Sequence, residues 1–399
     1  MFGFTRLLRK HCCIITVPSK LTTSVVLRKW FFILKKILFY AKLFLVISML
    51  NFGIDELSVW EKLQKTTEPI IMYGTGNGAD KVVDIFEKLD IELTGITASS
   101  GFVRERFFRG LPVKPIEYFE EKYDAFTVII TFGTSIPDVM NNIFNIAKKH
   151  RVLIPCVPVI GTEIFDRKFL NAHEKEINLA HSLLADDFSR RIFEGYVNFQ
   201  FGGRIEILKE IETPESEIDE NVLKFNQNET FIDIGAYRGD TVEKFVERTN
   251  GMYEKIIAAE PDFKTYQKLI KNCESLKNFT AINAAITDTD GEIGFSSLAG
   301  RQSAVGGENM IKSLSLPTLC KDCEPTFIKI DSEGCELEII SRGAEVLKKF
   351  KPKMNIAAYH KSEDIFKLPI LINSINPDYK IHLRHHPYIP AWDTLFYCV

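Results

Sequence analysis

The chain has 399 residues, of which 45% are hydrophobic and 26% are charged. This length exceeds what one ordinary hydrophobic core needs, so we expect at least two domains. The composition excludes collagen-like, intrinsically disordered and disulfide-stapled proteins. The 8 cysteines are scattered and several lie within apolar segments, which fits reduced thiols in the cytoplasm.

Charge is distributed unevenly along the chain. Nine of the 50 Lys and Arg residues precede Asp55, whereas none of the 53 acidic residues does. The rest of the chain is therefore acidic, which argues against nucleic acid as a partner.

Residues 1–53 form a basic and apolar extension. Within residues 28–50, Arg28, Lys35 and Lys42 recur at intervals of seven among apolar residues, a pattern typical of a helix that lies on a membrane surface. The alternative is that translation starts at Met49 and that residues 1–48 are absent from the native protein. We predict a cytoplasmic protein with peripheral membrane contact through this extension.

Strand and helix patterns alternate in residues 54–166. Strands are expected at 69–74, 91–96, 126–131 and 152–159, and helices after the first strand and at 136–147. This order predicts a small doubly wound, Rossmann-like domain with a parallel sheet.

A glycine-rich loop with Gly74, Gly76 and Gly78 joins the first expected strand to a helix, which favours a phosphate or nucleotide-like ligand at the helix N-terminus. A carboxylate that would hold the ribose of NAD is missing after the second strand, where residues 97–100 are Thr, Ala, Ser and Ser.

Residues 167–220 are expected to be a helical linker. Its last part, 211–220, is acidic and contains Pro214, which predicts a solvated connector without chemistry.

Residues 221–399 contain a second alternation. A buried strand at 230–234 carries Asp233 and runs into a turn with Gly235 and Gly239 before a helix. Glu260 follows the next strand, 255–259, at a place where a carboxylate can accept hydrogen bonds from both ribose hydroxyls of a cofactor. Further strands are expected at 279–286, 326–331, 354–358, 379–383 and 394–398.

This half resembles the FkbM family of S-adenosylmethionine-dependent methyltransferases. The similar stretches are FIDIGAYRGDT (231–241), AAEP (258–261), AAITDTDGEIGF (284–295), TFIKIDSEGCELEII (326–340), AAYHKSEDIFKLP (357–369) and RHH (384–386). Pro317 and Asp393 depart from the family pattern, which usually has acidic residues there, a glutamate in the second case. The resemblance implies a class I methyltransferase Rossmann-like sheet of seven strands with the last antiparallel, and O-methylation of a sugar in a glycan or a related natural product.

The strand-end rule for open parallel sheets and the resemblance together predict a cofactor site. Glycines allow the backbone to approach the methionine part of S-adenosyl-L-methionine, Asp233 and Asp240 bind its ammonium, Glu260 binds the ribose, and Asp288 borders the adenine. The predicted cofactor-binding residues are Asp233, Gly235, Ala236, Gly239, Asp240, Thr241, Glu260 and Asp288.

Catalysis requires a group that removes the proton of the acceptor hydroxyl. Five residues near expected strand ends are candidates: Asp331, Glu333, His360, His385 and His386. Each histidine alone also fits a structural role, and Asp331 and Glu333 with a histidine also fit a divalent cation. We assign no metal from the sequence.

Two other functions remain open. One is an NAD-dependent or nucleotide-sugar-dependent enzyme in which the first domain binds the cofactor. The other is a non-catalytic scaffold that keeps the fold of a methyltransferase.

Overall fold

The computed structural model describes residues 54–99, 106–296, 304–305, 307 and 309–399. The predicted membrane-surface helix at 28–50 and the alternative start at Met49 lie outside these residues. Among the described helices, none is both long and apolar enough to cross a membrane.

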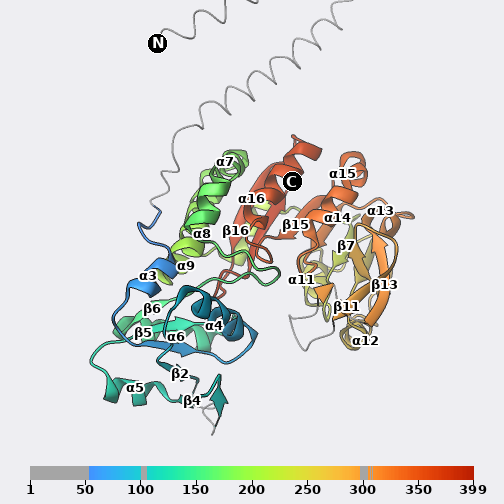
Figure 1. Ribbon diagram of the computed structural model, residues 1–399. Helices are drawn as coiled ribbons and strands as arrows, with labels where there is room; N and C mark the ends of the chain where they lie inside the picture. Colours follow the sequence, from blue (N-terminus) through green and yellow to red (C-terminus); the bar gives the residue numbers. More distant parts are fainter. Residues whose placement is uncertain (1–53, 100–105, 297–303, 306, 308) are drawn as a thin grey trace, which may run out of the picture. The chain divides into compact units, whose positions relative to one another are not determined.

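The first domain, which we keep at 54–166 as predicted, contains a six-stranded sheet in the order β3-β4-β2-β1-β5-β6 (Figure 1). Its parallel strands are β1 (Ile70–Tyr73), β2 (Gly95–Thr97), β4 (Leu111–Lys114), β5 (Thr127–Ile130) and β6 (Arg151–Leu153). The predicted strand 152–159 ends at Leu153, because Pro155 and Pro158 lack the N–H that a sheet requires. Neither β4 nor the antiparallel edge strand β3 (Phe107–Phe108) was predicted.

The helix α3 (Val59–Lys65) precedes β1. The helices α4 (Asn77–Leu89), α5 (Ile116–Lys122) and α6 (Pro137–Lys149) connect the strands. The helix α4 buries Ala79, Val82, Val83 and Phe86 on one side, as its spacing of apolar residues predicts.

The predicted linker is packed against the second domain. The helix α7 (Arg167–Leu183) contacts α16 (Asp364–Ile375), and α8 (Asp187–Gly202) contacts β16 (Ile381–His385). The short helices α9 (Glu206–Glu210), α10 (Glu215–Glu217) and η2 (Ile218–Val222) follow.

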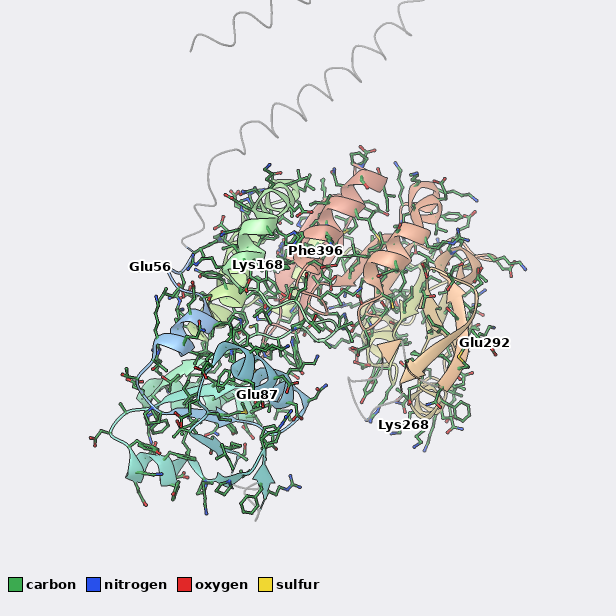
Figure 2. All side chains as sticks on the ribbon, viewed as in Figure 1. Glu56, Glu87, Lys168, Lys268, Glu292 and Phe396 are labelled. Atoms are coloured by element: carbon green, nitrogen blue, oxygen red, sulfur yellow. The ribbon has the colours of Figure 1, made fainter. Side chains whose placement is uncertain are left out.

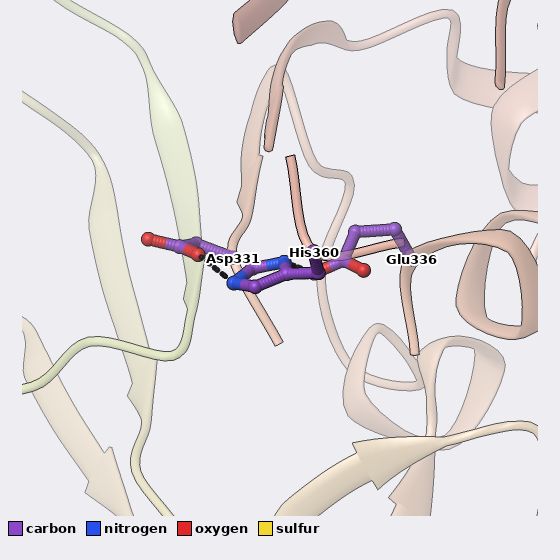
Figure 3. A group of neighbouring side chains, drawn as sticks. All are labelled: Asp331, Glu336 and His360. Carbon is purple, nitrogen blue, oxygen red and sulfur yellow. Dashed lines mark ion pairs between the residues drawn. The ribbon is translucent and has the colours of Figure 1, made fainter. Parts of the chain in front are cut away.

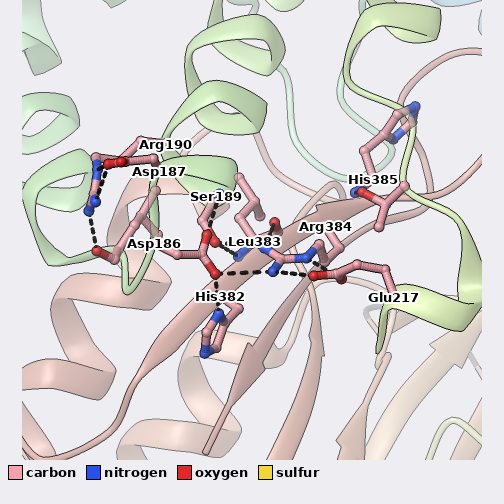
Figure 4. Close-up of polar contacts among 11 residues, drawn as sticks. Asp186, Asp187, Ser189, Arg190, Glu217, His382, Leu383, Arg384 and His385 are labelled. Atoms are coloured by element: carbon pink, nitrogen blue, oxygen red, sulfur yellow. Dashed lines mark hydrogen bonds and ion pairs between the residues drawn. The ribbon is translucent and has the colours of Figure 1, made fainter. Parts of the chain in front are cut away.

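The prediction of a solvated connector at 211–220 is wrong. Thr213 and Ile218 are buried, and the Glu217 carboxylate pairs with Arg384 of β16, whose side chain is only 2% exposed (Figure 4). At least one acidic residue of this segment therefore forms an ion pair with a buried arginine, which the local sequence pattern does not reveal.

The second domain, which we keep at 221–399 as predicted, contains a seven-stranded sheet in the order β16-β17-β15-β14-β7-β8-β9. Its other strands are β7 (Thr230–Ile234), β8 (Lys255–Ala259), β9 (Phe279–Ile282), β14 (Phe327–Ile330), β15 (Lys353–Ala357) and β17 (Thr394–Cys398). The last strand, β17, is antiparallel to both β15 and β16, as predicted. Helices α11 (Asp240–Arg248), α12 (Phe263–Asn272), α14 (Glu336–Arg342) and α15 (Ala344–Phe350) complete this α/β unit.

The single strand predicted at 279–286 is divided. It breaks at Asn283, whose side-chain amide donates hydrogen bonds to the carbonyls of Glu260 and Pro261. After the break, β10 (Ala285–Thr287) joins a separate four-stranded sheet with β11 (Gly291–Ser296), β12 (Ala304–Val305) and β13 (Asn309–Ser315), which leads to the short helix α13 (Leu316–Leu319). The segment around Asp288 therefore leaves the main sheet.

Burial follows the expected division of side chains. In Figure 2, the labelled charged residues Glu56, Glu87, Lys168, Lys268 and Glu292 are exposed, whereas Phe396 of β17 is fully buried. One hydrophobic core includes residues of both predicted domains, from Ile71 to Cys398. Burial of this apolar surface holds the two halves together.

The Arg384 ion pairs provide a test of the packed linker. The Nε atom of Arg384 lies 2.7 Å from Oε2 of Glu217, and Nη2 lies 3.1 Å from Oδ2 of Asp186. Arg384→Met leaves both carboxylates without this cation, so we expect a loss of about 3 kcal/mol in the free energy of unfolding in urea. Lys348→Met, which removes an exposed pair with Glu345, should change it by less than about 0.5 kcal/mol. Equal effects of the two substitutions would contradict the role given to Arg384.

Candidate active site

A cavity of about 620 Å³ lies at the carboxyl ends of β7, β8 and β14. The strand β7 has β14 on one side and β8 on the other, so the direction in which the chain adds strands reverses here. Ligands of open parallel sheets bind at this point. The cavity therefore occupies the place where the sequence predicts the cofactor.

The strands β7 and β14 approach each other closely at their ends. Gly235 adopts φ +77°, and a Cβ atom there would lie 1.8 Å from the backbone oxygen of Asp331. The ammonium of Lys329 donates a hydrogen bond of 2.7 Å to the Gly235 carbonyl. Only glycine allows this contact, because any side chain would collide with the β14 backbone.

Lys329 is also paired with two carboxylates. Its Nζ atom lies 3.4 Å from Oδ1 of Asp233 and 3.7 Å from Oδ2 of Asp331. Burial would lower the pKa of Lys329, but Asp233 and Asp331 outweigh this effect and raise it, so the lysine is charged. Burial raises the pKa of Asp233 to about 6 despite the pair with Lys329.

Glu260 lines the cavity at the end of β8. Its carboxylate accepts hydrogen bonds of 2.9 Å from the backbone N–H groups of Tyr237 and Asp262. Burial raises the pKa of Glu260 to about 7, although these hydrogen bonds favour the charged form. The group is therefore oriented by the backbone and titrates near neutral pH.

The predicted cofactor residues are placed differently from one another. Gly235, Asp240, Thr241 and Glu260 line the cavity. Asp233 is fully buried and faces Lys329, so the geometry does not support the predicted direct contact of Asp233 with a cofactor ammonium.

Three further predicted residues do not line the cavity. Ala236 is buried and donates its N–H to Ala259, and a Cβ atom at Gly239 would lie 2.8 Å from the sulfur of Cys273. Asp288 is exposed beyond β10, and Ala284, Ala285 and Ile286 line the cavity in its place.

Asp331, Glu333 and His360 meet at the cavity. Nε2 of His360 lies 3.4 Å from Oδ1 of Asp331, and Nδ1 lies 3.0 Å from Oε1 of Glu336 (Figure 3). Nε2 also lies 3.5 Å from Oε2 of Glu333. The hydroxyl of Tyr359 donates a hydrogen bond of 3.1 Å to Oδ1 of Asp331. Glu333 and Gly334 adopt positive φ angles of 52° and 95°, which turn the chain back around the imidazole.

The charge of His360 follows from this surrounding. Burial would lower its pKa, but Glu336, together with Asp331 and Glu333, outweighs burial and raises the pKa of His360 to about 10. The imidazole is therefore protonated at neutral pH and has no lone pair that could accept a proton. The carboxylates of Asp331 and Glu333 lie beside it at the cavity and can accept one.

A metal ion does not fit this arrangement as it stands. Asp331, Glu336 and His360 place possible ligand atoms within 4.8 Å of one another. However, Asp331 faces Nε2 and Glu336 faces Nδ1, so the two carboxylates lie on different edges of the ring (Figure 3). Each ring nitrogen is thus paired with a carboxylate of its own, and the geometry is that of an imidazolium between anions.

His385 and His386 are not brought to the cavity. His385 is fully buried and its Nδ1 lies 3.0 Å from Oγ1 of Thr394, while Nε2 of His386 lies 3.0 Å from the Tyr397 hydroxyl. His385 ends the edge strand β16 and His386 follows it, and β17 and β15 separate this strand from β14. The prediction that they share one rim with His360 is therefore not supported by the geometry.

Close packing accounts for much of the glycine-rich loop in the first domain. A Cβ atom at Gly74 would lie 2.7 Å from Oγ1 of Thr131, and one at Gly78 would lie 2.3 Å from the Thr131 carbonyl. Gly76 has no such neighbour within 4 Å, and only Gly78 of the three lines the cavity. The close packing thus explains Gly74 and Gly78 without a phosphate ligand.

Sequence reasoning missed several residues of the site, notably Lys329, Glu336 and Tyr359. A signal existed for Lys329, since it is the one charged residue within the otherwise apolar strand Phe327–Ile330. Glu336 lies in the acidic motif that carries the resemblance, but its burial under His360 depends on the turn at Glu333 and Gly334.

Comparison with known proteins agrees with this geometry. Residues 233–389 match the model of the methyltransferase FkbM domain. No curated protein matches the chain.

Among solved structures, methyltransferase FkbM from Methylobacillus flagellatus KT is similar, with 22% identity, a TM-score of 0.67, and coverage of 90% of this chain and 98% of that chain. The fibrillarin of Aeropyrum pernix in complex with natively bound S-adenosyl-L-methionine is more distant, with 10% identity, a TM-score of 0.28, and coverage of 45% and 71%.

The cavity at the switch point, the close approach at Gly235 and the carboxylate of Glu260 fit the predicted cofactor, S-adenosyl-L-methionine. The similarity to the solved FkbM structure supports the predicted fold. The match of residues 233–389 to the methyltransferase FkbM domain confirms the predicted resemblance and identifies this half of the chain as an S-adenosylmethionine-dependent methyltransferase domain.

Proposed function

We propose that the enzyme transfers a methyl group to a hydroxyl of a sugar, either in a glycan or in a related natural product. The observation that supports this most is the pair of carboxylates, Asp331 and Glu333, in the same cavity as Gly235 and Glu260. A sugar hydroxyl is a weak nucleophile and gains from a proton acceptor during attack.

The second domain would hold the cofactor. Gly235 provides a backbone surface without a side chain, Asp240 and Thr241 line the cavity beside it, and Glu260 accepts hydrogen bonds from the ribose hydroxyls. The bound cofactor supplies an electrophilic methyl group on a sulfonium centre. The protein then has to align the acceptor oxygen with that methyl group, which contributes much of the acceleration in such a displacement.

The charged cluster would handle the proton. Asp331 or Glu333 takes the proton of the hydroxyl as its oxygen bonds to the methyl carbon. His360 keeps its own proton and orients both carboxylates from Nε2, and the buried Glu336 orients His360 from the other edge of the ring.

Titration of Glu260 predicts how cofactor binding depends on pH. Hydrogen bonds from both ribose hydroxyls need the ionised carboxylate, and with a pKa of about 7 the ionised fraction rises from roughly a tenth at pH 6 to roughly nine tenths at pH 8. We therefore expect calorimetric affinity for S-adenosylmethionine to increase about tenfold over this range. In Glu260→Gln the affinity should be low and should lose this dependence, which separates Glu260 from groups of the cofactor itself. Glu247→Gln, on the exposed side of α11, is the control.

Removal of the carboxylates should slow turnover and spare cofactor binding. We expect Asp331→Asn and Glu333→Gln to lower kcat by about 10²-fold or more, with the Kd of S-adenosylmethionine within about threefold of the wild-type value. The control is Glu338→Gln. Glu338 is an exposed residue of α14 whose carboxylate pairs with Lys361. If both site variants keep the wild-type kcat, another group accepts the proton.

The acceptor class is tested by methyl transfer. The full chain is incubated with S-adenosylmethionine labelled in the methyl group and with neutral sugars, sugar nucleotides or glycans. A sugar product whose label resists alkaline hydrolysis is the expected result, because a methyl ether resists base and a methyl ester does not. Label found only in base-labile products would refute sugar O-methylation.

The same preparation tests the two alternatives. A first-domain NAD enzyme predicts calorimetric binding of NAD that Gly76→Val abolishes, and Gly76 has room for the substitution. A scaffold predicts tight binding of S-adenosylmethionine without turnover on any acceptor. The cytoplasmic location, the membrane contact of residues 28–50 and the nucleotide-like ligand of the glycine-rich loop stay predictions.

A further inference from the structure

The carboxyl edge of the first sheet also faces the active-site cavity. Asn77, Gly78 and Lys81 of α4 line it after β1, Gly133 lines it after β5, and residues 157–160 line it after β6. In this sheet β1 lies between β2 and β5, so this edge is a switch point as well. Two such edges thus contribute to one cavity, and ligands bind at such edges.

Lys81 joins α4 to the segment 157–160. Its ammonium donates hydrogen bonds of 2.9 and 2.8 Å to the carbonyls of Pro158 and Val159. The next residue, Ile160, donates its N–H to the carbonyl of His360 over 2.9 Å. A continuous chain of hydrogen bonds therefore connects the first domain to the strand end that carries the catalytic cluster.

An aromatic wall completes this side of the cavity. Tyr388 and Trp392 both line it, with ring centroids 6.2 Å apart and planes inclined by 31°. Thr134 of the first domain and Ile389 exchange two backbone hydrogen bonds, of 2.7 and 2.9 Å, which fix the segment that carries the rings.

Gly133 allows the Trp392 ring to lie against the first domain. A Cβ atom at Gly133 would lie 2.3 Å from the Trp392 ring and 3.2 Å from the Tyr388 ring. The position of the aromatic wall therefore depends on a residue of the first domain, 259 positions away from Trp392.

The cavity has more lining than the cofactor uses. The contacts proposed for S-adenosylmethionine, Gly235, Asp240, Thr241 and Glu260, all belong to the second domain. The lining from the first domain and the aromatic wall remains for the other substrate. A volume of about 620 Å³ is in the range of cavities that hold ligands of substantial size.

We propose that the first domain and the aromatic wall of the second domain together form the acceptor half of the active site, where Tyr388 and Trp392 hold the apolar face of a sugar ring. This inference rests on the proposed sugar O-methylation for the identity of the acceptor. A sugar ring has a C–H face that packs on an aromatic ring and peripheral hydroxyls that need hydrogen-bond partners. Asn77 and Lys81 supply donors on one side, and Asp331 and Glu333 supply acceptors on the other.

Tryptophan fluorescence tests the subsite without turnover. The full chain is saturated with S-adenosylhomocysteine and titrated with the methyl glycosides of glucose, galactose and mannose. We expect saturable quenching of the fluorescence by at least one of these probes. Trp392→Phe should remove this quenching, while the affinity for S-adenosylhomocysteine, measured without fluorescence, stays within twofold of the wild-type value. Absence of saturable quenching in the wild type, or its persistence in Trp392→Phe, would overturn the proposal.

Kinetics then separate this inference from the proposed function. The acceptor is a sugar that the wild-type enzyme methylates. For this acceptor, Trp392→Ala and Lys81→Met should each raise KM at least tenfold and leave the Kd of the cofactor within twofold of the wild-type value. Lys81→Arg should restore part of the loss, and Lys88→Met, exposed on the same helix, should behave as wild type. Quenching without methyl transfer would refute sugar O-methylation and support the sugar subsite. Methyl transfer to the sugar with an unchanged KM in both variants would support sugar O-methylation and refute the subsite.

Discussion

A buried lysine at the junction of the two central strands fixes the geometry on which the rest of the site depends. Lys329 is 9% exposed, and an unpaired ammonium at such a place would cost several kcal/mol. It is compensated by the Gly235 carbonyl, by Asp233 and by Asp331. Because one cation binds the end of β7 and the end of β14, the glycine turn and the Asp331 carboxylate are held at a fixed separation. The surface proposed for the cofactor and the carboxylate proposed to accept the proton are thus positioned by the same interaction.

The spacing of the acidic residues after β14 places their carboxylates around the His360 ring. Asp331 and Glu333 reach one edge of the His360 ring, and Glu336, in the first turn of α14, reaches the other. The left-handed conformations of Glu333 and Gly334 bring the chain around the ring, at a backbone cost that functional sites commonly carry. Three carboxylates around one imidazolium leave a net negative charge at the cavity. Such a charge suits a site that must accept a proton next to a cationic methyl donor.

Much of this fold could be predicted from the sequence, because buried strands such as Thr230–Ile234 and Lys255–Ala259 are apolar and end in glycine or an acid. These local signals also placed Gly235, Glu260 and Asp331 at one edge. Strand order could not be predicted in the same way. His385 and Asp288 follow strands just as Asp331 does, yet one strand lies at the far edge of the sheet and the other belongs to a different sheet. The side-chain direction of Asp233 depends on the buried partner Lys329, which is 96 residues away in the chain.

Contacts between distant segments also explain why the sequence does not predict how the first domain and the linker pack against the second domain. Glu217 looks like a solvent-exposed acid until Arg384 is placed beside it, and Gly133 looks like an ordinary loop glycine until Trp392 lies on it. Both partners belong to the last sixteen residues of the chain. The edge strand β16, the segment that carries Tyr388 and Trp392, and β17 follow one another in the chain, so the edge of the methyltransferase sheet and the aromatic wall of the cavity are built by one continuous segment. A segment that pairs with the sheet on one side and with the first domain on the other can keep its position only if both are present. The acceptor side of the cavity is therefore a property of the whole chain, whereas the cofactor side is a property of the second domain.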